Sequence, residues 1–268
     1  MVGHCRGIDN AIHPRSRTLV LEVLPELRGA ADDALLAAQF EVSTRPLSMK
    51  IDASARHDLA LARRHRAVLV QLCPPWRFTV DAALHTWAAG RGGACAPVTD
   101  ADRPELLDQF VHHYRAQHAW WSPAASIPVL AQQLRDGFEP GDASFDLARS
   151  RLLRRDGTVV AAGLLWPPED DGEPAELTLT ALPYQSPTAR VDLEACLAAV
   201  LTCLPDGAVV EIDSHVTEPV ESALVRDLPA TAEGEWLAIV EVPVPGGPTP
   251  VPLFRSLVPD ACVWARDL

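Results

Sequence analysis

The chain has 268 residues, of which 48% are hydrophobic, and a formal net charge of −13 at pH 7. This length suffices for one large domain or two small ones, and the acidic charge argues against DNA or RNA as the main partner, because a nucleic-acid backbone is bound by clustered Lys and Arg. No run of about 18 apolar residues and no apolar run suited to a secretory signal occurs, so we expect a cytoplasmic protein without a membrane span.

The six cysteines form neither a CxxC pair nor a Cys/His cluster with zinc spacing, so the sequence predicts no metal site. Cys73, Cys196 and Cys262 lie in apolar runs and are expected to be buried thiols. Arg, Ala and Pro are frequent and Lys50 is the only lysine, a composition typical of a GC-rich bacterial genome.

The first elements in the chain form a pattern that returns later. Residues 19–40 predict a strand, a Leu-Pro turn, a polar loop and a helix, and residues 177–200 predict the same order. The two Leu-Pro pairs begin at Leu24 and Leu182, and Ile-Asp pairs follow at Ile51 and Ile212. We interpret this agreement as a duplicated β-α-β-α-β unit.

The segment between the two copies predicts two helices and a hairpin. Thr99 or Asp100 is a plausible N-cap for the first helix, which has Pro104 in its first turn. Residues 126–138 predict the second helix. Asp156 and Gly157 separate two apolar runs, and Asp-Gly in this position is a strong hairpin signal. A proline-rich polar turn then leads into a strand at 176–182.

Four stretches between about residue 96 and residue 244 follow one another in a characteristic order: "VTDADRPELLDQF", "RLLRRDGTVVAAGLLW", "LTALPYQSPTARVDLEACLAAVL" and "VVEIDSHVTEPVESALVRDL". In these stretches and in the order of its elements, the chain resembles the GNAT superfamily of N-acyltransferases. This resemblance implies an α/β fold with a GNAT-like mixed sheet flanked by helices, preceded by a partial second GNAT-like unit. We expect an N-terminal extension at 1–17, the partial unit at 18–92 and the complete domain at 93–268.

This tandem arrangement is similar to that of the mycothiol synthases, although the first copy here lacks the early helices and the hairpin. An incomplete sheet exposes a strand edge. Either the first copy is truncated, or it borrows strands from elsewhere. A partner strand or a homodimer would then cover its sheet edge.

The resemblance implies acetyl-CoA or another acyl-CoA as cofactor, with its pyrophosphate held by the loop at 185–190. The residues this assigns to cofactor binding are Leu182, Gln185, Thr188, Ala189 and Arg190. Gln185 fits the first position of the family's loop pattern. Thr188 and Arg190, however, occupy positions where the family has small residues, and glycine is what lets a backbone approach a ligand closely. A hydroxyl and a guanidinium can still bind phosphate.

Acyl transfer to an amine needs a base that deprotonates the ammonium. Glu176 begins the cofactor strand, where the family often has this base, and Ser214 and His215 end the next strand; these three are the catalytic candidates. Many members also have a Tyr that protonates the departing thiolate. Here Ala223 and Leu224 stand in that region.

The stretch "HHYRAQHAWW" at 112–121 has the most unusual local composition, and the resemblance places it along the acceptor pocket. Aromatic faces attract cations. Tyr114, His118, Trp120 and Trp121 are therefore the candidates for binding a small-molecule amine.

The leading hypothesis is transfer of an acetyl or other acyl group from a CoA-type thioester to the amine of a small molecule. The altered loop leaves two alternatives open. One is a GNAT-fold enzyme with a different donor, either a carrier-protein thioester or an aminoacyl-tRNA. The other is a non-catalytic GNAT-like binding protein.

Overall fold

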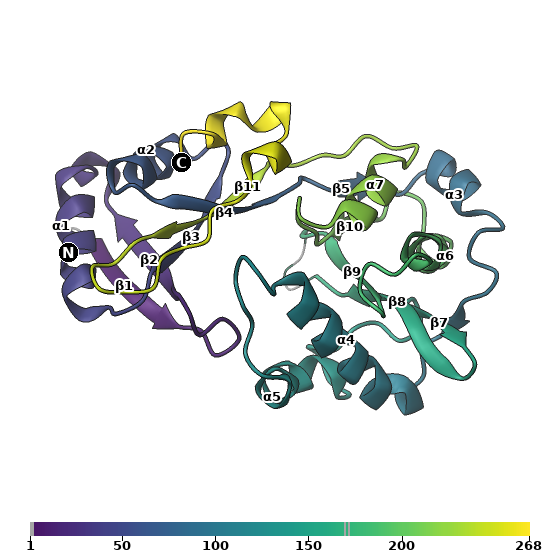
Figure 1. Ribbon diagram of the computed structural model, residues 1–268. Coiled ribbons are helices and arrows are strands. Elements are labelled where there is room, and N and C mark those ends of the chain that lie inside the picture. The colour runs from purple at the N-terminus through teal and green to yellow at the C-terminus, as the bar shows by residue number, and fades with distance from the viewer. Residues whose placement is uncertain (1–2, 169, 171) are drawn as a thin grey trace. The chain divides into compact units, whose positions relative to one another are not determined.

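The computed structural model describes residues 3–168, 170 and 172–268, which form two compact units (Figure 1). Unit 1 takes the chain up to Pro74 together with His118–Ala125 and Glu235–Leu268. Unit 2 takes Pro75–Gln117 and Ser126–Gly234. In the described part of the chain, no helix has the length and hydropathy needed to cross a membrane.

Unit 1 is built on a five-stranded sheet in the order β1-β2-β3-β11-β4. The β1–β2 pair is antiparallel, β2 and β3 are parallel, and β11 runs antiparallel to both β3 and β4. Its strands and helices are β1 (Gly3–Asp9), β2 (Arg17–Val23), α1 (Ala30–Val42), β3 (Leu47–Asp52), α2 (Arg56–Arg64), β4 (Val68–Cys73) and β11 (Leu237–Val242), with short 3-10 helices at Pro25–Leu27, Arg255–Leu257 and Asp260–Ala265.

The strand β11 completes the sheet of the first copy, although it is the last strand of the second copy in the sequence. Its residues Ala238, Val240 and Val242 are fully buried, as expected for an apolar strand with neighbours on both sides. The expectation of a borrowed strand is confirmed, and the strand comes from this chain. A homodimer stays a prediction.

Within the range 1–17, expected to be an N-terminal extension, Gly3–Asp9 forms β1 and pairs along its whole length with β2. Residues 1 and 2 lie outside the described part. The partial unit at 18–92 and the complete domain at 93–268 stay predictions. The compact units follow different limits, because β11 joins unit 1.

Unit 2 is built on a six-stranded sheet in the order β5-β10-β9-β8-β7-β6, in which only β9 and β10 are parallel neighbours. The expected order of helix, helix, hairpin, strand, helix, strand and helix is confirmed. Its elements are β5 (Arg77–Thr79), α3 (Ala82–Ala88), β6 (Ala96–Pro97), a 3-10 turn (Asp100–Asp102), α4 (Arg103–Gln117), α5 (Ile127–Phe138), β7 (Arg151–Arg155), β8 (Thr158–Trp166), β9 (Ala175–Ala181), α6 (Ala189–Leu201), β10 (Val209–Ile212) and α7 (Pro219–Arg226).

Two local signals act as the sequence predicts. Asp156 and Gly157 both have positive φ, of 50° and 82°, as a two-residue hairpin turn requires. Thr99 opens the first helix through a capping box, in which its N–H donates to the Asp102 carboxylate at 2.8 Å. These turns set the hairpin β7–β8 and the start of α4.

Helices cover both faces of the unit 2 sheet (Figure 1). Side chains of α3, α6 and α7 pack in one buried cluster with Leu177 and Leu179 of β9, whereas α4 and α5 pack on the other face around Leu164 of β8. Because side chains alternate along a strand, Thr178 and Thr180 face α4 and α5. The Thr180 hydroxyl donates to Gln109 of α4 at 3.3 Å, which agrees with this parity.

The three cysteines expected to be buried differ in exposure. Cys196 and Cys262 are fully buried, whereas Cys73, the last residue of β4, is half-buried.

Candidate functional site

The parallel strands β9 and β10 separate at their carboxyl ends. Their pairing stops at Leu177 and Ile212, while β9 continues to Ala181. The edge of β9 beyond Leu177 therefore has no β10 partner. In open α/β sheets, ligands bind in such crevices at the carboxyl ends of parallel strands.

A cavity of about 300 Å³ lies on the α4–α5 face of this region, a size at the lower end for small-molecule sites. Its wall carries four aromatic rings and two carboxylates besides polar and aliphatic side chains, and among the described residues that line it there is no Lys or Arg. The aromatic and acidic residues are Phe110, Tyr114, Phe138, Trp166, Glu176 and Asp213.

The aromatic wall is held by edge-to-face packing and one hydrogen bond. The Phe138 ring lies 5.3 Å from Phe110 and 5.7 Å from Trp166, with interplanar angles of 62° and 75°. Trp166 Nε1 donates to the Thr178 hydroxyl at 3.0 Å. The same hydroxyl lies 3.4 Å from the Glu176 carboxylate, so β8 and β9 together position this carboxylate at the wall.

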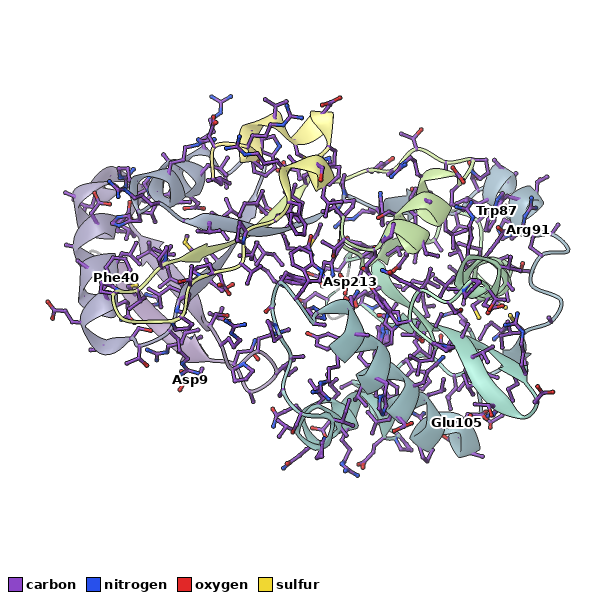
Figure 2. All side chains as sticks on the ribbon, viewed as in Figure 1. Asp9, Phe40, Trp87, Arg91, Glu105 and Asp213 are labelled. Carbon is purple, nitrogen blue, oxygen red and sulfur yellow. The ribbon has the colours of Figure 1, made fainter. Side chains whose placement is uncertain are left out.

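The two carboxylates stand at the mouth of the cavity. Glu176 and Asp213 are both exposed, and Asp213 directly follows β10 (Figure 2). Burial raises the pKa of the Tyr114 phenol, and the nearby charge of Asp213 raises it further. The cavity therefore combines an apolar aromatic interior with negative charge at its entrance.

Of the catalytic candidates, the structure brings only Glu176 to the cavity wall. Ser214 and His215 are buried in the turn before α7, where the Ser214 hydroxyl and the His215 N–H donate to Glu218 at 3.2 Å and 2.9 Å. His215 Nδ1 lies 3.6 Å from the same carboxylate. Both residues thus fix the start of α7.

Of the acceptor-binding candidates, only Tyr114 lines the cavity. The segment His118–Ala125 belongs to unit 1. There the His118 ring lies 4.9 Å from both His13 and Trp121, and Trp120 stacks on Phe254 at 5.5 Å. The structure therefore places His118, Trp120 and Trp121 in the packing of unit 1, and they are not among the residues that line the cavity.

The loop expected to hold a pyrophosphate uses part of its backbone in its own turns. Gln185 has a φ of 54°, and the N–H groups of Ser186 and Ala189 donate to carbonyls of the loop at 3.0 Å. The N–H of Leu182 donates to Val160 at 2.9 Å. In this conformation the N–H groups of Ser186 and Ala189 are therefore not turned toward a ligand.

The cations near the start of α6 are paired with carboxylates. Arg155 of β7 donates to the Thr188 hydroxyl at 3.0 Å and forms a two-point ion pair with buried Asp192. Arg190 donates to Asp227, just beyond α7, at 2.6 Å. A phosphate at this helix N-terminus would compete with both carboxylates.

The crevice between the end of β9 and α7 is filled by side chains. The hollow left there measures only about 20 Å³, room for about one water molecule. His113 Nδ1 lies 3.2 Å from the main-chain N and O of Ala181, and the Tyr184 ring packs edge-on against His113 at 5.2 Å. An extended thioester arm does not fit in this conformation unless His113 and Tyr184 move.

Buried acids line the same hollow. Glu218 and Glu221 are each 3% exposed, and burial together with the charges of Glu218 and Asp213 raises the pKa of Glu221 well above its ordinary value. Burial lowers the pKa of His113. In the described residues, His113 Nε2 and Glu221 Oε1 are buried without a hydrogen-bond partner, so the cluster is only partly satisfied.

Several residues of the site were missed from the sequence. The sequence does contain a signal for the aromatic wall, because Phe110 and Tyr114 are four residues apart on α4 and therefore lie on one helix face. His113, Arg155 and Glu221 carry no local signal. Their places depend on contacts with β9, α6 and α7.

Comparison with known proteins identifies the fold. No family profile matches the sequence, and no curated protein matches it. Among solved structures, a GCN5-related N-acetyltransferase from Sphaerobacter thermophilus has 11% identity and a TM-score of 0.54, with 94% of this chain and 79% of that chain covered. A GNAT-family acetyltransferase from Colwellia psychrerythraea has 15% identity and a TM-score of 0.54, with 90% and 80% covered.

A tandem GNAT protein from the clavulanic acid biosynthesis pathway has 14% identity and a TM-score of 0.54, with 88% of this chain and 76% of that chain covered. The two mixed sheets and their helices are therefore those of the GNAT fold. Within this fold, the chain has the tandem arrangement in which two copies follow one another.

Proposed function

We propose that the protein transfers an acyl group to the amine of a small molecule bound in the α4–α5 cavity of unit 2. The observation that carries the proposal is the position of this cavity, beside the free edge of β9 with Glu176 and Asp213 at its mouth. The GNAT fold supports acyl transfer as the class of reaction.

The charge of the cavity favours a cationic acceptor. Two carboxylates and no Lys or Arg stand among the described lining residues, so an ammonium group gains attraction at the mouth. Phe110, Phe138 and Trp166 supply apolar area and aromatic faces for the body of the molecule. The acceptor class is therefore a small amine with an apolar or aromatic body.

Glu176 is the residue proposed to take the proton from the bound ammonium. It is exposed and lines the cavity. The Thr178 hydroxyl, which accepts a hydrogen bond from Trp166, orients its carboxylate. A base must reach the proton it removes. Ser214 and His215 donate hydrogen bonds to Glu218 and do not line the cavity, so we propose that they position α7.

An acyl-CoA donor would place its phosphates at the loop before α6. The residues proposed to contact it are Leu182, Gln185, Thr188, Ala189 and Arg190, to which the structure adds Arg155 through its contact with Thr188. When bound, such a donor supplies an activated thioester. Its arm would follow the edge of β9 after His113 and Tyr184 turn away.

The filled crevice favours a second candidate, a GNAT-fold protein that binds an amine without using CoA. This second candidate includes both an enzyme with a different acyl donor and a protein that only binds the amine. The carboxylate of Glu218 in the crevice also disfavours a polyanionic donor.

Calorimetry separates the candidates. The full chain is titrated with 2-phenylethylamine and, separately, with acetyl-CoA, and mixtures are assayed by mass spectrometry for the N-acetyl product. Glu176→Gln should weaken binding of the amine or slow its acetylation. Asp108→Asn, which changes an exposed carboxylate on α4, should do neither. Binding of both ligands with product supports acyl transfer from CoA.

Amine binding without acetyl-CoA binding would instead favour the second candidate. Failure of a panel of small amines to bind would contradict both, because each depends on the same cavity.

A further inference from the structure

Two cysteines of unit 2 lie within reach of a disulfide. Cys95 Sγ is 3.8 Å from Cys196 Sγ, and both thiols are free. A disulfide joins its sulfurs at about 2.05 Å, so closure requires a shift of about 2 Å or less. Cys95 is half-buried and precedes β6, whereas Cys196 is fully buried within α6.

The loop before β6 holds Cys95 against α6. Arg91 Nε donates to Glu194 of α6 at 3.0 Å, and its guanidinium lies 5.1 Å from the Trp87 ring (Figure 2). A Cβ on Gly92 would lie 2.7 Å from the Cα of Ala199, so glycine permits this close approach. The two thiols are thus neighbours because of several independent contacts.

The two thiols have opposite electrostatic environments. The hydrogen bond with Cys196 lowers the pKa of Cys95, burial opposes this, and the charge of Arg151 lowers it further. The hydrogen bond with Cys95 and burial raise the pKa of Cys196 well above its ordinary value. In unit 1, burial alone raises the pKa of Cys5 and of Cys262 to about 11.

We propose that Cys95 is a peroxide-sensitive thiol and that Cys196 resolves its oxidised form into an intrachain disulfide. The Cys95 thiolate attacks one oxygen of hydrogen peroxide, which leaves a sulfenic acid and releases hydroxide. The Cys196 sulfur then attacks the sulfenic sulfur, the new S–S bond forms, and water leaves with the Cys196 proton. Peroxide is reduced and the two thiols lose two electrons in total.

This modification site is independent of the proposed acyl transfer. A partly accessible thiol with a lowered pKa beside a buried second thiol is the arrangement that redox-sensitive cysteines use. The disulfide would tie the loop before edge strand β6 to the middle of α6. Since the crosslink closes a long segment of chain, oxidation should raise the thermal midpoint of unit 2, and a dithiol should reverse the rise.

The test oxidises the reduced full chain with hydrogen peroxide and maps disulfides by non-reducing peptide mass spectrometry. We expect a Cys95–Cys196 peptide, an intact mass lower by two hydrogens, and reversal by dithiothreitol. Cys203→Ser is the matched control, because Cys203 lies in the turn just after α6 and contacts Arg151. This variant should form the same disulfide.

Trapping separates the two roles. In Cys196→Ser, the sulfenic acid should persist and react with dimedone at Cys95, whereas Cys95→Ser should give no dimedone adduct at Cys196. A Cys95 that oxidises no faster than Cys5 or Cys262 would overturn the proposal. So would a disulfide that joins Cys95 to Cys203 or to a second molecule in place of Cys196.

Discussion

The imidazole of His113 lies against the main chain of Ala181, because its Nδ1 atom is 3.2 Å from both the N and the O of that residue. Ala181 ends the part of β9 that has no β10 partner. A free strand edge is a template for an extended ligand that donates and accepts main-chain hydrogen bonds. In this structure a side chain of the same protein takes that place.

Removing the Tyr184 ring should open the crevice. We expect Tyr184→Ala to bind acetyl-CoA at least about tenfold more tightly than the wild type, a gain of about 1.4 kcal/mol. The reason is that the ring fills the hollow between His113 and α7. Tyr184→Phe keeps the ring and should behave as the wild type in calorimetry. Equal affinities for all three proteins would show that the ring does not limit entry.

Glu221→Gln should stabilise the protein increasingly as the pH rises. Burial raises the folded-state pKa of this carboxyl above its ordinary value of 4.5, so the folded protein holds the proton more tightly than the unfolded chain. The stability this contributes is complete below about 4.5 and is lost as pH rises through the folded pKa. Gln does not titrate.

The advantage of the variant should therefore grow by up to about 1.4 kcal/mol per pH unit between about pH 4.5 and the folded-state pKa of Glu221. Urea unfolding between about pH 5 and about pH 8 measures it. Glu211→Gln, at a half-exposed carboxylate paired with Arg77, is the control. A flat difference for Glu221→Gln would mean that its carboxylate is solvated in the folded state.

Two arginines at the start of α6 should differ in their effect on stability. Arg155→Ala leaves the buried carboxylate of Asp192 without its two-point partner and should cost about 1–3 kcal/mol. Arg190→Ala removes a pair with exposed Asp227 and should cost about 0.5 kcal/mol or less. Chemical denaturation of both variants checks the ranking, and the reverse order would contradict this account of the loop.

Gly137→Ala should shrink the amine cavity without unfolding α5. A Cβ at Gly137 would lie 3.0 Å from Cζ3 of Trp166, so the indole must shift in its position on the cavity wall. Helix propensity favours Ala over Gly by about 1 kcal/mol, which offsets the steric cost. We expect weaker binding of 2-phenylethylamine with a thermal midpoint close to the wild type. Unchanged amine affinity would place the ligand away from Trp166.

The sequence determined the identity and order of the elements. Strand and helix periods marked both copies, and Asp156-Gly157 fixed the hairpin because two consecutive residues with positive φ form its turn. The sequence also determined which side of the sheet each residue of β9 faces, since alternation alone puts Glu176 and Thr178 on the face opposite Leu177. These properties depend on residues close together in the chain.

Tertiary structure decided the rest. The pairing of β11 with β3 and β4 joins residues more than 160 positions apart, and no local period encodes such a partner. The placement of His118 and Trp121 in unit 1, and of His113 against Ala181, likewise depends on which surfaces meet after the elements form. The sequence therefore determined a fold with a crevice, whereas side-chain packing between distant elements decided that a histidine and a tyrosine fill it.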